Sequence, residues 1–387
     1  GCQMNQYDAD KIRTALVARG AYETAEEGAD AIIFIGCSIR DKAEHKVWSE
    51  LGHYEERWRK ERRPVVAMTG CIAQNVGVDM SRRYPWIRVV SGPRHIGLAP
   101  DALETAMSGD EKIVLLDDDP RELHELRFAP LERQFPWKAS VMISHGCDNF
   151  CTYCIVPQTR GMYVSRSPEE TSAEADRLFR DHAEIMISGI NLGQYGRDRP
   201  EWGTFWDLLA HIEKDLAPSW AGRRRFRISS LEPSQLKDRA LSVLAASRLA
   251  APHLHISLQH ASQRILRRMG RGHYSVDTLL RAVEKIHGFW PVMGLGCDII
   301  VGFPGEEERD VEELCRFLQD SPMTYAHVFP YSRRPGTPAA SFPGQIPRAE
   351  KLARAAAVRG VVAEKARAFW ESQLERGVMA IIPDAEA

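Results

Sequence analysis

Apolar and polar positions along the first hundred residues follow the pattern of a parallel α/β domain. Residues 8–20 and 40–61 repeat apolar positions with the period of a helix. Between and after them, short apolar runs typical of buried strands occur at 31–37 ("AIIFIGC"), 64–71 ("PVVAMTGC") and 86–92 ("WIRVVSG"). The pattern predicts an open parallel α/β sheet domain over residues 1–95.

A second series of strands and helices follows, and we place it in residues 137–345. One of its helices, at 167–182, has Ser167 and Pro168 as start signals, and another is expected at 276–290. Strands are expected at 139–145, 183–189, 225–230, 253–259, 293–302 and 324–330. Six βα units predict a partial (β/α)6 barrel, whose active site would lie at the carboxyl ends of the strands. The fold class is therefore α/β, with an open sheet followed by a partial barrel.

Two further segments complete the predicted organisation. Residues 96–136 contain prolines and an acidic run, which suits a connector. Residues 346–387 read as a long helix with a basic face, followed in "GVMAIIPDAEA" by what looks like the start of a strand. Because the chain opens at Gly1 and Cys2 without a methionine, we expect that sequence is missing at both ends.

The charge balance gives little information about partners. Lys and Arg number 51 against 53 Asp and Glu, a formal net charge of -2, so a nucleic-acid surface would have to be a local patch. Glutamates are interspersed in the basic run 55–63, which we interpret as a solvated helix, as we do the run 222–226. The sequence has no apolar run long enough to cross a bilayer and no signal-type segment at its start, so we expect a cytoplasmic protein.

Three of the eight cysteines are grouped in "SHGCDNFCTYCIVPQTRG". Cys147, Cys151 and Cys154 follow the first predicted barrel strand with the spacing C-x-x-x-C-x-x-C, and no fourth cysteine is near. Structural zinc and closed iron–sulfur sites both take four protein ligands. A set of three thiolates leaves one metal position open for chemistry.

A second set of three cysteines is spread over the first domain. Cys37 and Cys71 each end a predicted strand, and Cys2 would do so if a strand preceded it. Since the carboxyl ends of parallel strands share one edge of a sheet, we expect these three thiols to converge. The remaining two, Cys297 in a strand and Cys315 on an apolar helix face, are expected in the core.

The order of several motifs resembles the radical S-adenosylmethionine (SAM) methylthiotransferases. The motifs are "GCQMNQYD", "GCSIRDKAEHKVWSELG", "MTGCIAQ", "GCDNFCTYCIVPQTRG", "GFPGE" and "FPYSRRPGTPAA", and they cover nearly the whole chain. The resemblance implies an enzyme that inserts sulfur at an unactivated C–H and methylates it, at C2 of an N6-modified adenosine beside the tRNA anticodon. It also implies two [4Fe-4S] clusters, one on each cysteine triplet, SAM as cosubstrate, tRNA as partner, and an external electron donor such as flavodoxin or ferredoxin.

The resemblance also carries residue assignments. For SAM these are Tyr153, Gly189, Asn191, Gln259, Arg271, Ile300, Val301 and Gly302, and for the substrate Asn5, Arg333 and Arg334. Asp8 is a further candidate between the two clusters, or alternatively the cap of the first helix.

This chain departs from the family pattern in three places. "FIGC" precedes the second cysteine where relatives have an Asn-Thr pair, and Met162 and Tyr163 stand where relatives are more basic. The family's carboxyl-terminal RNA-gripping module, TRAM, is represented in these 387 residues by no more than its first residues, so we expect it to be truncated or missing. The first difference implies that a polar contact near the second cluster is missing, and the other two concern the substrate. The cluster ligands themselves are in place.

Several alternatives therefore stay open. "GCQMNQYD" and "CSIRDKAEHKV" favour an N6-isopentenyl adenosine, whereas "RISSLEP", "HLHISLQ" and "HVFPYSRRPGTPAA" favour threonylcarbamoyladenosine; we prefer the first. The missing TRAM module motivates a second hypothesis, methylthiolation of a protein side chain such as aspartate. A third is a zinc-stabilised RNA-binding protein in which a ligand such as His145 completes the cysteine loop.

Overall fold

The computed structural model describes residues 2–38, 41–61, 63–116, 119, 123–124 and 138–376, and the following statements concern these residues. Contacts divide the chain into two compact units. Unit 1 comprises Gly1–Leu231, Asp238–Ala251 and Ser332–Ala340, and unit 2 comprises Glu232–Lys237, Pro252–Tyr331 and Ser341–Ala387. Each unit is described by itself.

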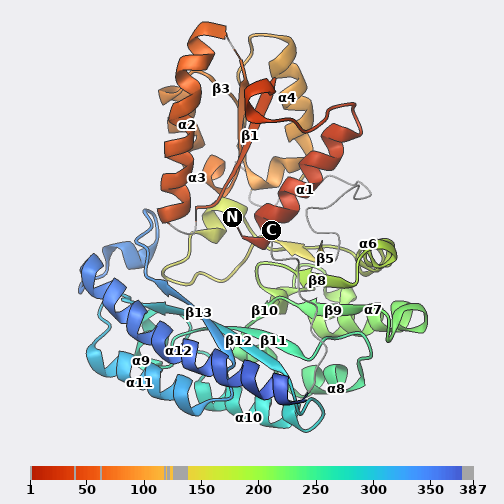
Figure 1. Cartoon of the computed structure of the whole chain (residues 1–387), viewed down its shortest axis with the longest axis vertical. Coiled ribbons are helices and arrows are strands. Elements are labelled where there is room, and N and C mark those ends of the chain that lie inside the picture. The colour runs from red at the N-terminus through yellow and green to blue at the C-terminus, as the bar shows by residue number, and fades with distance from the viewer. Residues whose placement is uncertain are drawn as a thin grey trace. The chain divides into compact units, whose positions relative to one another are not determined.

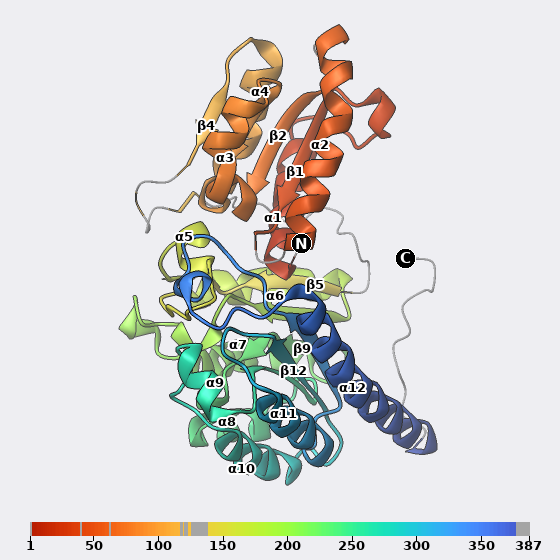
Figure 2. The same ribbon diagram turned by 90° about the vertical axis from the view of Figure 1, so that its left-hand side faces the viewer.

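Unit 1 begins with a four-stranded parallel sheet of order β1-β2-β3-β4 (Figures 1 and 2). Its strands are β1 (Ala31–Gly36), β2 (Val65–Gly70), β3 (Ile87–Ser91) and β4 (Ile113–Leu115). Its helices are α1 (Gln3–Val17), η1 (Glu26–Gly28), α2 (Asp41–Glu61), α3 (Cys71–Arg83), η2 (Pro93–Leu98) and α4 (Ala99–Ser108). The open parallel sheet predicted from the sequence is confirmed.

Alternate residues of β2 point to opposite faces of this sheet, which explains its continuous apolar run. Val66 and Met68 pack with residues of α2 and α3, whereas Val65 and Ala67 pack with residues of α4. All four strand residues are buried, because helices cover the sheet on both faces. The domain is a three-layer α/β/α arrangement.

Two features of this domain differ from the sequence-based prediction. The first helix begins at Gln3 rather than residue 8, because the carbonyl of Cys2 already accepts a hydrogen bond from the Gln6 N–H at 3.1 Å. Asp8 therefore lies inside α1 and does not cap it. In the segment 96–136, the described residues include α4 and β4; the prediction of a connector for residues 117–118, 120–122 and 125–136 falls outside the described residues.

The remainder of unit 1 contains the first three strands of the second βα series. They form a parallel sheet of order β5-β8-β9, with β5 (Lys138–Met142), β8 (Glu184–Ser188) and β9 (Arg225–Ile228). Its helices are α5 (Val156–Arg160), α6 (Pro168–Asp181), η3 (Leu192–Gln194), η4 (Pro200–Trp202), α7 (Phe205–Trp220) and α8 (Asp238–Ala246). The short strands β6 (Ser144–His145), β7 (Val164–Ser165) and β10 (Ser230–Leu231) also belong here, and η6 (Pro338–Ser341) begins in this unit. Ser167 caps α6 as predicted, since its hydroxyl accepts the Glu170 N–H at 3.0 Å.

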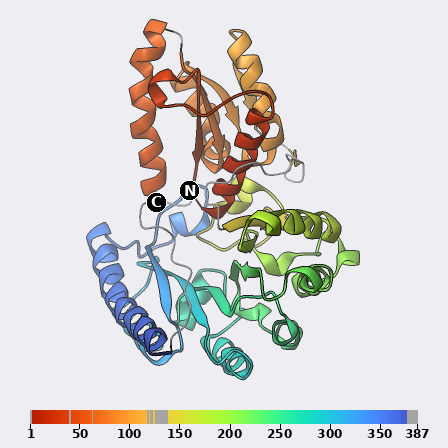
Figure 3. The same ribbon diagram turned by 45° about the vertical axis from the view of Figure 1, so that its right-hand side comes forward.

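Unit 2 contains the last three strands, which are parallel and adjacent in the order β11-β12-β13. They are β11 (His253–Gln259), β12 (Gly294–Val301) and β13 (Tyr325–Pro330). The helices are η5 (Pro233–Gln235), α9 (Gln263–Arg268), α10 (Val276–His287), α11 (Glu308–Asp320) and α12 (Arg348–Arg376), the last of which runs beside β13 (Figure 3). Each unit thus contributes three parallel strands in sequential order, which together account for the six βα units predicted from the sequence.

The long carboxyl-terminal helix ends at Arg376, and the predicted strand start in 377–387 lies outside the described residues. Across the described part of the chain, no helix is both long enough and apolar enough to cross a membrane.

Candidate active site

Two of the amino-terminal cysteines lie side by side because of the strand register. Gly36 is paired with Gly70, so Cys37 and Cys71 directly follow the ends of two neighbouring parallel strands. Both glycines are needed for this close approach. A Cβ on Gly36 would lie 2.0 Å from Ile72 Cγ2, and Gly70 has φ +84° with its Cβ position 2.9 Å from the Gly36 carbonyl.

Cys2 is brought to the same edge by Asn5. The Cys2 thiol donates to Asn5 Oδ1 at 3.1 Å, and Asn5 Nδ2 donates to the Gly36 carbonyl at 3.0 Å. A hydrogen bond from Cys37 lowers the pKa of Cys2 to about 5; burial opposes this shift and the positive charge of Arg160 adds to it. The predicted convergence of these three cysteines is thus present in the structure, and Asn5, predicted to contact substrate, attaches Cys2 to the end of β1.

A buried arginine joins this cysteine set to the second cysteine loop. Arg160, the last residue of α5, donates through Nε to Cys71 Sγ at 3.2 Å and through Nη2 to Asp8 Oδ2 at 2.7 Å. The ion pair is almost inaccessible, with side-chain exposures of 2% and 3%. Burial alone would lower the pKa of Arg160, but Cys71 and Asp8 outweigh it and the pKa is raised. Burial raises the pKa of the Cys71 thiol, against the effect of Arg160.

Arg160 was not among the site residues predicted from the sequence. Arg160 lies in the "TRG" that follows the cysteine loop. Its position shortly after the third cysteine was the one feature of the sequence that could have indicated a role near the clusters. Its partner Asp8 is 152 residues away in the sequence, so no local pattern could pair them.

The second cysteine loop is closed at its base by a small hairpin. Ser144 pairs with Ser165 and His145 with Val164, so the chain leaves and returns at the same point. Gly146, with φ +67°, opens the loop, and a Cβ there would lie 1.9 Å from the Met162 carbonyl oxygen. Only glycine fits this position without moving backbone.

Polar side chains hold the loop in shape around the cysteines. Gln194 accepts the Asp148 N–H at 2.9 Å and donates to Asn149 Oδ1 at 2.8 Å. The Asp148 carboxylate accepts the Tyr163 N–H at 2.7 Å, and the Asn149 N–H donates to Cys147 Sγ at 3.4 Å. Backbone N–H groups directed at a sulfur are one way in which a protein tunes a bound iron–sulfur cluster.

A distant segment of unit 1, residues 332–340, packs against the same loop. Ala339 N–H donates to the Thr152 carbonyl at 2.8 Å, and Gln158 Nε2 donates to the Gly336 carbonyl at 2.8 Å. Within this segment the two arginines predicted to contact substrate differ. Arg333 is exposed, whereas Arg334 is buried and forms an ion pair of 2.7 Å with Glu44.

The predicted SAM-binding residues of unit 1 lie around the end of β8 and in the cysteine loop. Gly189 approaches the loop closely, since a Cβ there would lie 2.6 Å from Ser144 Oγ. Asn191 is buried and caps η3 by accepting the Gly193 N–H at 3.2 Å. Tyr153 is partly exposed beside Cys154.

In unit 2, Gln259 and Arg271 have unusual environments. Gln259, at the end of β11, has φ +68° and is the one described non-glycine residue with positive φ. Such a strained backbone often marks a functional position. Arg271 is buried and donates to Glu232 Oε1 at 2.9 Å and to the Ser257 carbonyl at 3.1 Å.

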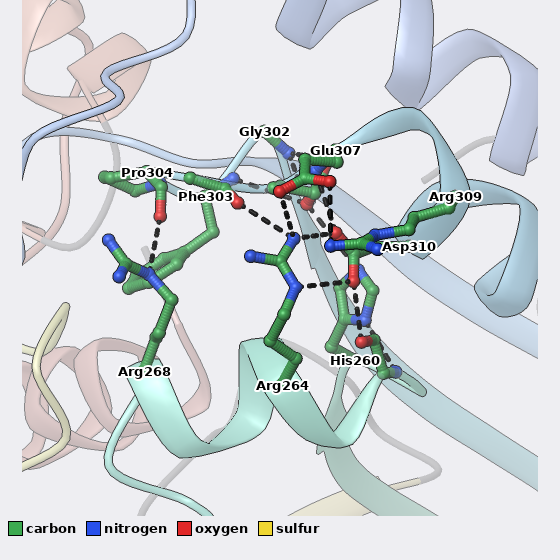
Figure 4. Close-up of polar contacts among 12 residues, drawn as sticks. His260, Arg264, Arg268, Gly302, Phe303, Pro304, Glu307, Arg309 and Asp310 are labelled. Atoms are coloured by element: carbon green, nitrogen blue, oxygen red, sulfur yellow. Dashed lines mark hydrogen bonds and ion pairs between the residues drawn. The ribbon is translucent and has the colours of Figure 1, made fainter.

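Ile300, Val301 and Gly302 lead into a turn that a buried carboxylate holds. Glu306 accepts the Gly302 N–H at 2.8 Å and Arg354 Nη1 at 2.9 Å, and lies 3.6 Å from His260 Nε2. Burial would raise the pKa of Glu306, but these partners outweigh it and the pKa is lowered. Figure 4 shows the neighbouring contacts, in which Arg264 joins Asp310 to Glu307.

Comparison with known proteins is consistent with this geometry. Residues 1–92 match the model of the uncharacterized protein family UPF0004, and residues 141–318 match that of the radical SAM superfamily. A tRNA-2-methylthio-N(6)-dimethylallyladenosine synthase from Clostridium botulinum strain Hall is 34% identical over 382 residues, which is 97% of this chain and 83% of the relative. The chain belongs to the radical SAM methylthiotransferase family.

Two further comparisons agree. A protein of the same name from Dictyoglomus thermophilum is 36% identical over 350 residues, 90% of this chain and 77% of the relative. The structure of the radical S-adenosylmethionine methyltransferase TsrM from Kitasatospora setae, with cobalamin and a [4Fe-4S] cluster bound, has a TM-score of 0.63 at 15% identity, over 86% of this chain and 73% of that chain. At this identity the similarity concerns the fold alone.

The spacing of the thiols in both cysteine triplets differs from the spacing expected around one zinc ion. Two thiolates on one zinc ion, with bonds of about 2.3 Å, lie about 3.8 Å apart. Among the described residues, His255, Asp298 and His327 have three potential ligand atoms within 4.8 Å of one another. The three thiols of each cysteine triplet are not that close together. Both triplets thus supply three thiols over a wider span than one zinc ion requires, and N–H groups of Asn149 and Arg160 donate to Cys147 and Cys71.

Proposed function

We propose that this chain is a tRNA methylthiotransferase that places a methylthio group on C2 of an N6-modified adenosine beside the anticodon. The observation that carries the proposal is the presence of two three-cysteine sites in one compact unit, joined by the Arg160 contact to Cys71 and Asp8. The names of the relatives favour a dimethylallyl group on N6, in agreement with the preference drawn from "GCQMNQYD".

We assign SAM and one [4Fe-4S] cluster to the Cys147, Cys151 and Cys154 loop, as the radical SAM family requires. A second [4Fe-4S] cluster on Cys2, Cys37 and Cys71 is our proposal, and it rests on the shared edge of β1 and β2. When bound, a cluster with an iron that lacks a protein ligand can hold a small ligand, SAM at the first site and sulfur at the second.

The chain's own residues would exclude water and fix the sulfur atoms. Cys37, Cys71 and Cys147 are each less than a tenth exposed, and Arg160 donates a charged hydrogen bond to the Cys71 sulfur. Burial and such hydrogen bonds set the reduction potential of a cluster. We also propose SAM contacts for the residues that the family resemblance indicates. These are Tyr153, Gly189 and Asn191 in unit 1, and Gln259, Arg271, Ile300, Val301 and Gly302 in unit 2.

For the partners, tRNA is the proposed substrate, and a flavodoxin or ferredoxin is the proposed electron donor. Arg333 is exposed and is the better candidate for contact with substrate, since Arg334 is buried against Glu44. The basic run on α2 is neutralised by ion pairs from Arg57, Arg59 and Lys60 to glutamates four residues away, so we do not assign it to RNA.

The deciding experiment is methylthio transfer to tRNA by the anaerobically reconstituted enzyme. Total tRNA carrying N6-dimethylallyladenosine is incubated with SAM and a reductant, digested and analysed for 2-methylthio nucleosides by mass spectrometry. We expect product with the wild type and with the control Cys315→Ser, and none with Cys71→Ala or Cys151→Ala. Unmodified tRNA together with a methylthiolated aspartate in ribosomal protein would establish the protein-modifying alternative.

Cluster number is tested separately by iron and acid-labile sulfide per chain. We expect about eight irons in the wild type and about four in a Cys147→Ala/Cys151→Ala/Cys154→Ala variant, which should also lose SAM cleavage. Four irons in the wild type would contradict a cluster on the amino-terminal triplet. A colourless protein that contains zinc and no iron would instead support the RNA-binding alternative.

A further inference from the structure

A cluster of histidines and one aspartate lies on one face of the β11-β12-β13 sheet in unit 2. The strand register places His255, Gly296 and Tyr325 in one row across the three strands, and Asp298 pairs with His327 two residues further along. The alternate residues Leu295, Cys297 and Ile299 on β12 are fully buried on the opposite face. Sequence reasoning assigned no role to any member of this cluster.

Three potential ligand atoms converge here. His255 Nε2 lies 3.1 Å from Asp298 Oδ1, His327 Nδ1 lies 3.3 Å from the same oxygen, and all three atoms lie within 4.8 Å of one another. Two ligands bound to one ion at about 2.1 Å in tetrahedral geometry are about 3.4 Å apart. The spacing of these side chains is therefore close to that of a mononuclear metal site.

The surroundings of His255 resemble the outer shell of a metal-bound histidine. Its Nδ1 lies 3.0 Å from the Tyr325 hydroxyl, which lies 2.8 Å from His253 Nε2. A histidine that binds a metal through one nitrogen usually has the other fixed by a hydrogen bond, which sets the tautomer and the ring orientation. A hydroxyl both donates and accepts hydrogen bonds, so Tyr325 can accept a hydrogen bond from His255 Nδ1–H and donate one to His253 Nε2.

Gly296 makes this contact possible. A Cβ at this position would lie 2.0 Å from Tyr325 Cζ, so the phenol ring lies directly over the glycine and reaches across β12 to β11. A larger residue would displace the ring from both histidines.

Burial is graded in a way that suits an ion with open coordination positions. The side chain of His255 is 10% exposed, that of Asp298 is 24% exposed and that of His327 is 57% exposed. The site is thus anchored in the sheet and accessible from the His327 side. Two imidazoles and one carboxylate favour zinc or ferrous iron, with water in the remaining positions.

We propose that His255, Asp298 and His327 bind one divalent transition-metal ion, separate from the iron–sulfur clusters. The ligand set carries one negative charge when both imidazoles are neutral, and this charge partly offsets that of a divalent cation. Tyr325 is the positioning residue that orients His255.

The test is equilibrium dialysis of the reconstituted holoenzyme against buffered Zn²⁺, with zinc, iron and sulfide measured per chain. We expect one zinc per chain without loss of acid-labile sulfide. Asp298→Asn and His327→Ala should weaken zinc binding by about 100-fold or more, and Tyr325→Phe by roughly 10- to 100-fold. The control His211→Gln removes a histidine whose Nε2 lies 3.2 Å from Asp215 within one helix, a pair without a third ligand, and should bind zinc as the wild type does.

Three results would overturn the proposal. Zinc uptake accompanied by loss of both iron and acid-labile sulfide would place the zinc in the cluster sites. Less than one zinc per chain, or the same affinity in Asp298→Asn and His327→Ala as in the wild type, would mean that the cluster is a hydrogen-bonded network alone. Circular dichroism of each variant shows whether it has folded, and Asp298→Asn keeps the shape and size of the side chain.

Discussion

Replacing Arg160 with methionine tests whether the contact between the two cysteine sites is a buried ion pair. The substitution keeps most of the side-chain volume and leaves the Asp8 carboxylate, which is 3% exposed, without its charged partner. Breaking a buried pair by removing one member costs about 3–5 kcal/mol, because an uncompensated charge remains in the interior. For a compact unit of this size, that corresponds to a fall of roughly 6–20 °C in the melting temperature.

The assay is thermal unfolding of anaerobic protein, followed by circular dichroism at a fixed scan rate. Arg160→Met should lower the first transition by this amount, and Arg160→Met/Asp8→Leu should recover most of it, since an apolar pair replaces the charges. The matched control is Arg239→Met, whose pair with Asp207 at 2.8 Å has side-chain exposures of 54% and 42%. An exposed pair contributes about 0–1 kcal/mol, so this variant should melt close to the wild type.

A second readout concerns the cluster rather than the fold. In the Cys147→Ala/Cys151→Ala/Cys154→Ala background, iron and acid-labile sulfide per chain together report on a cluster of the amino-terminal triplet, and Arg160→Met should reduce both because Cys71 loses its hydrogen bond at 3.2 Å. If Arg160→Met melts like Arg239→Met and retains its iron, the reasoning from burial is wrong.

Three further predictions follow from individual contacts. Gly146→Ala should lose the iron of the radical SAM cluster, whereas Gly20→Ala, also at positive φ but with no atom within 4 Å of its Cβ, should keep it; equal iron contents would refute the steric argument. Folding lowers the pKa of Glu306, so the loss of unfolding free energy in Glu306→Gln should be constant above about pH 4.3 and shrink as the pH falls further. The measurement is unfolding of iron-free protein at several pH values. A loss that grows in acid would contradict the direction of this pKa shift. Phe226→Ala, at 0% exposure, should cost about 3–5 kcal/mol in urea unfolding, and Phe150→Ala, at 71% exposure, less than about 0.5 kcal/mol; similar costs would contradict the described core.

Local patterns in the sequence were sufficient for the elements and for the grouping of six cysteines into two sets of three. Apolar runs of strand length alternate with helical periods, and all six predicted barrel strands and the capped start of α6 are present. The convergence of Cys37 and Cys71 was also predictable, because parallel strands end at a common edge and each cysteine follows its strand. The start of α1 was placed five residues late, since Cys2 as a cap gives no polar side-chain signal.

Contacts between distant residues were decided by the tertiary structure alone. Asp8 and Arg160 are 152 residues apart in the sequence, and Glu44 and Arg334 are 290 residues apart. Nothing in the sequence around these residues indicates which oppositely charged side chain each one will pair with. The same holds for His255, Asp298 and His327, which come from three strands and meet only through the register of the sheet. The sequence by itself determined the periodicity, the strand ends and the ligand chemistry, because these depend on neighbours along the chain. The tertiary structure determined which charges are buried together, because burial depends on packing between segments that no local pattern records.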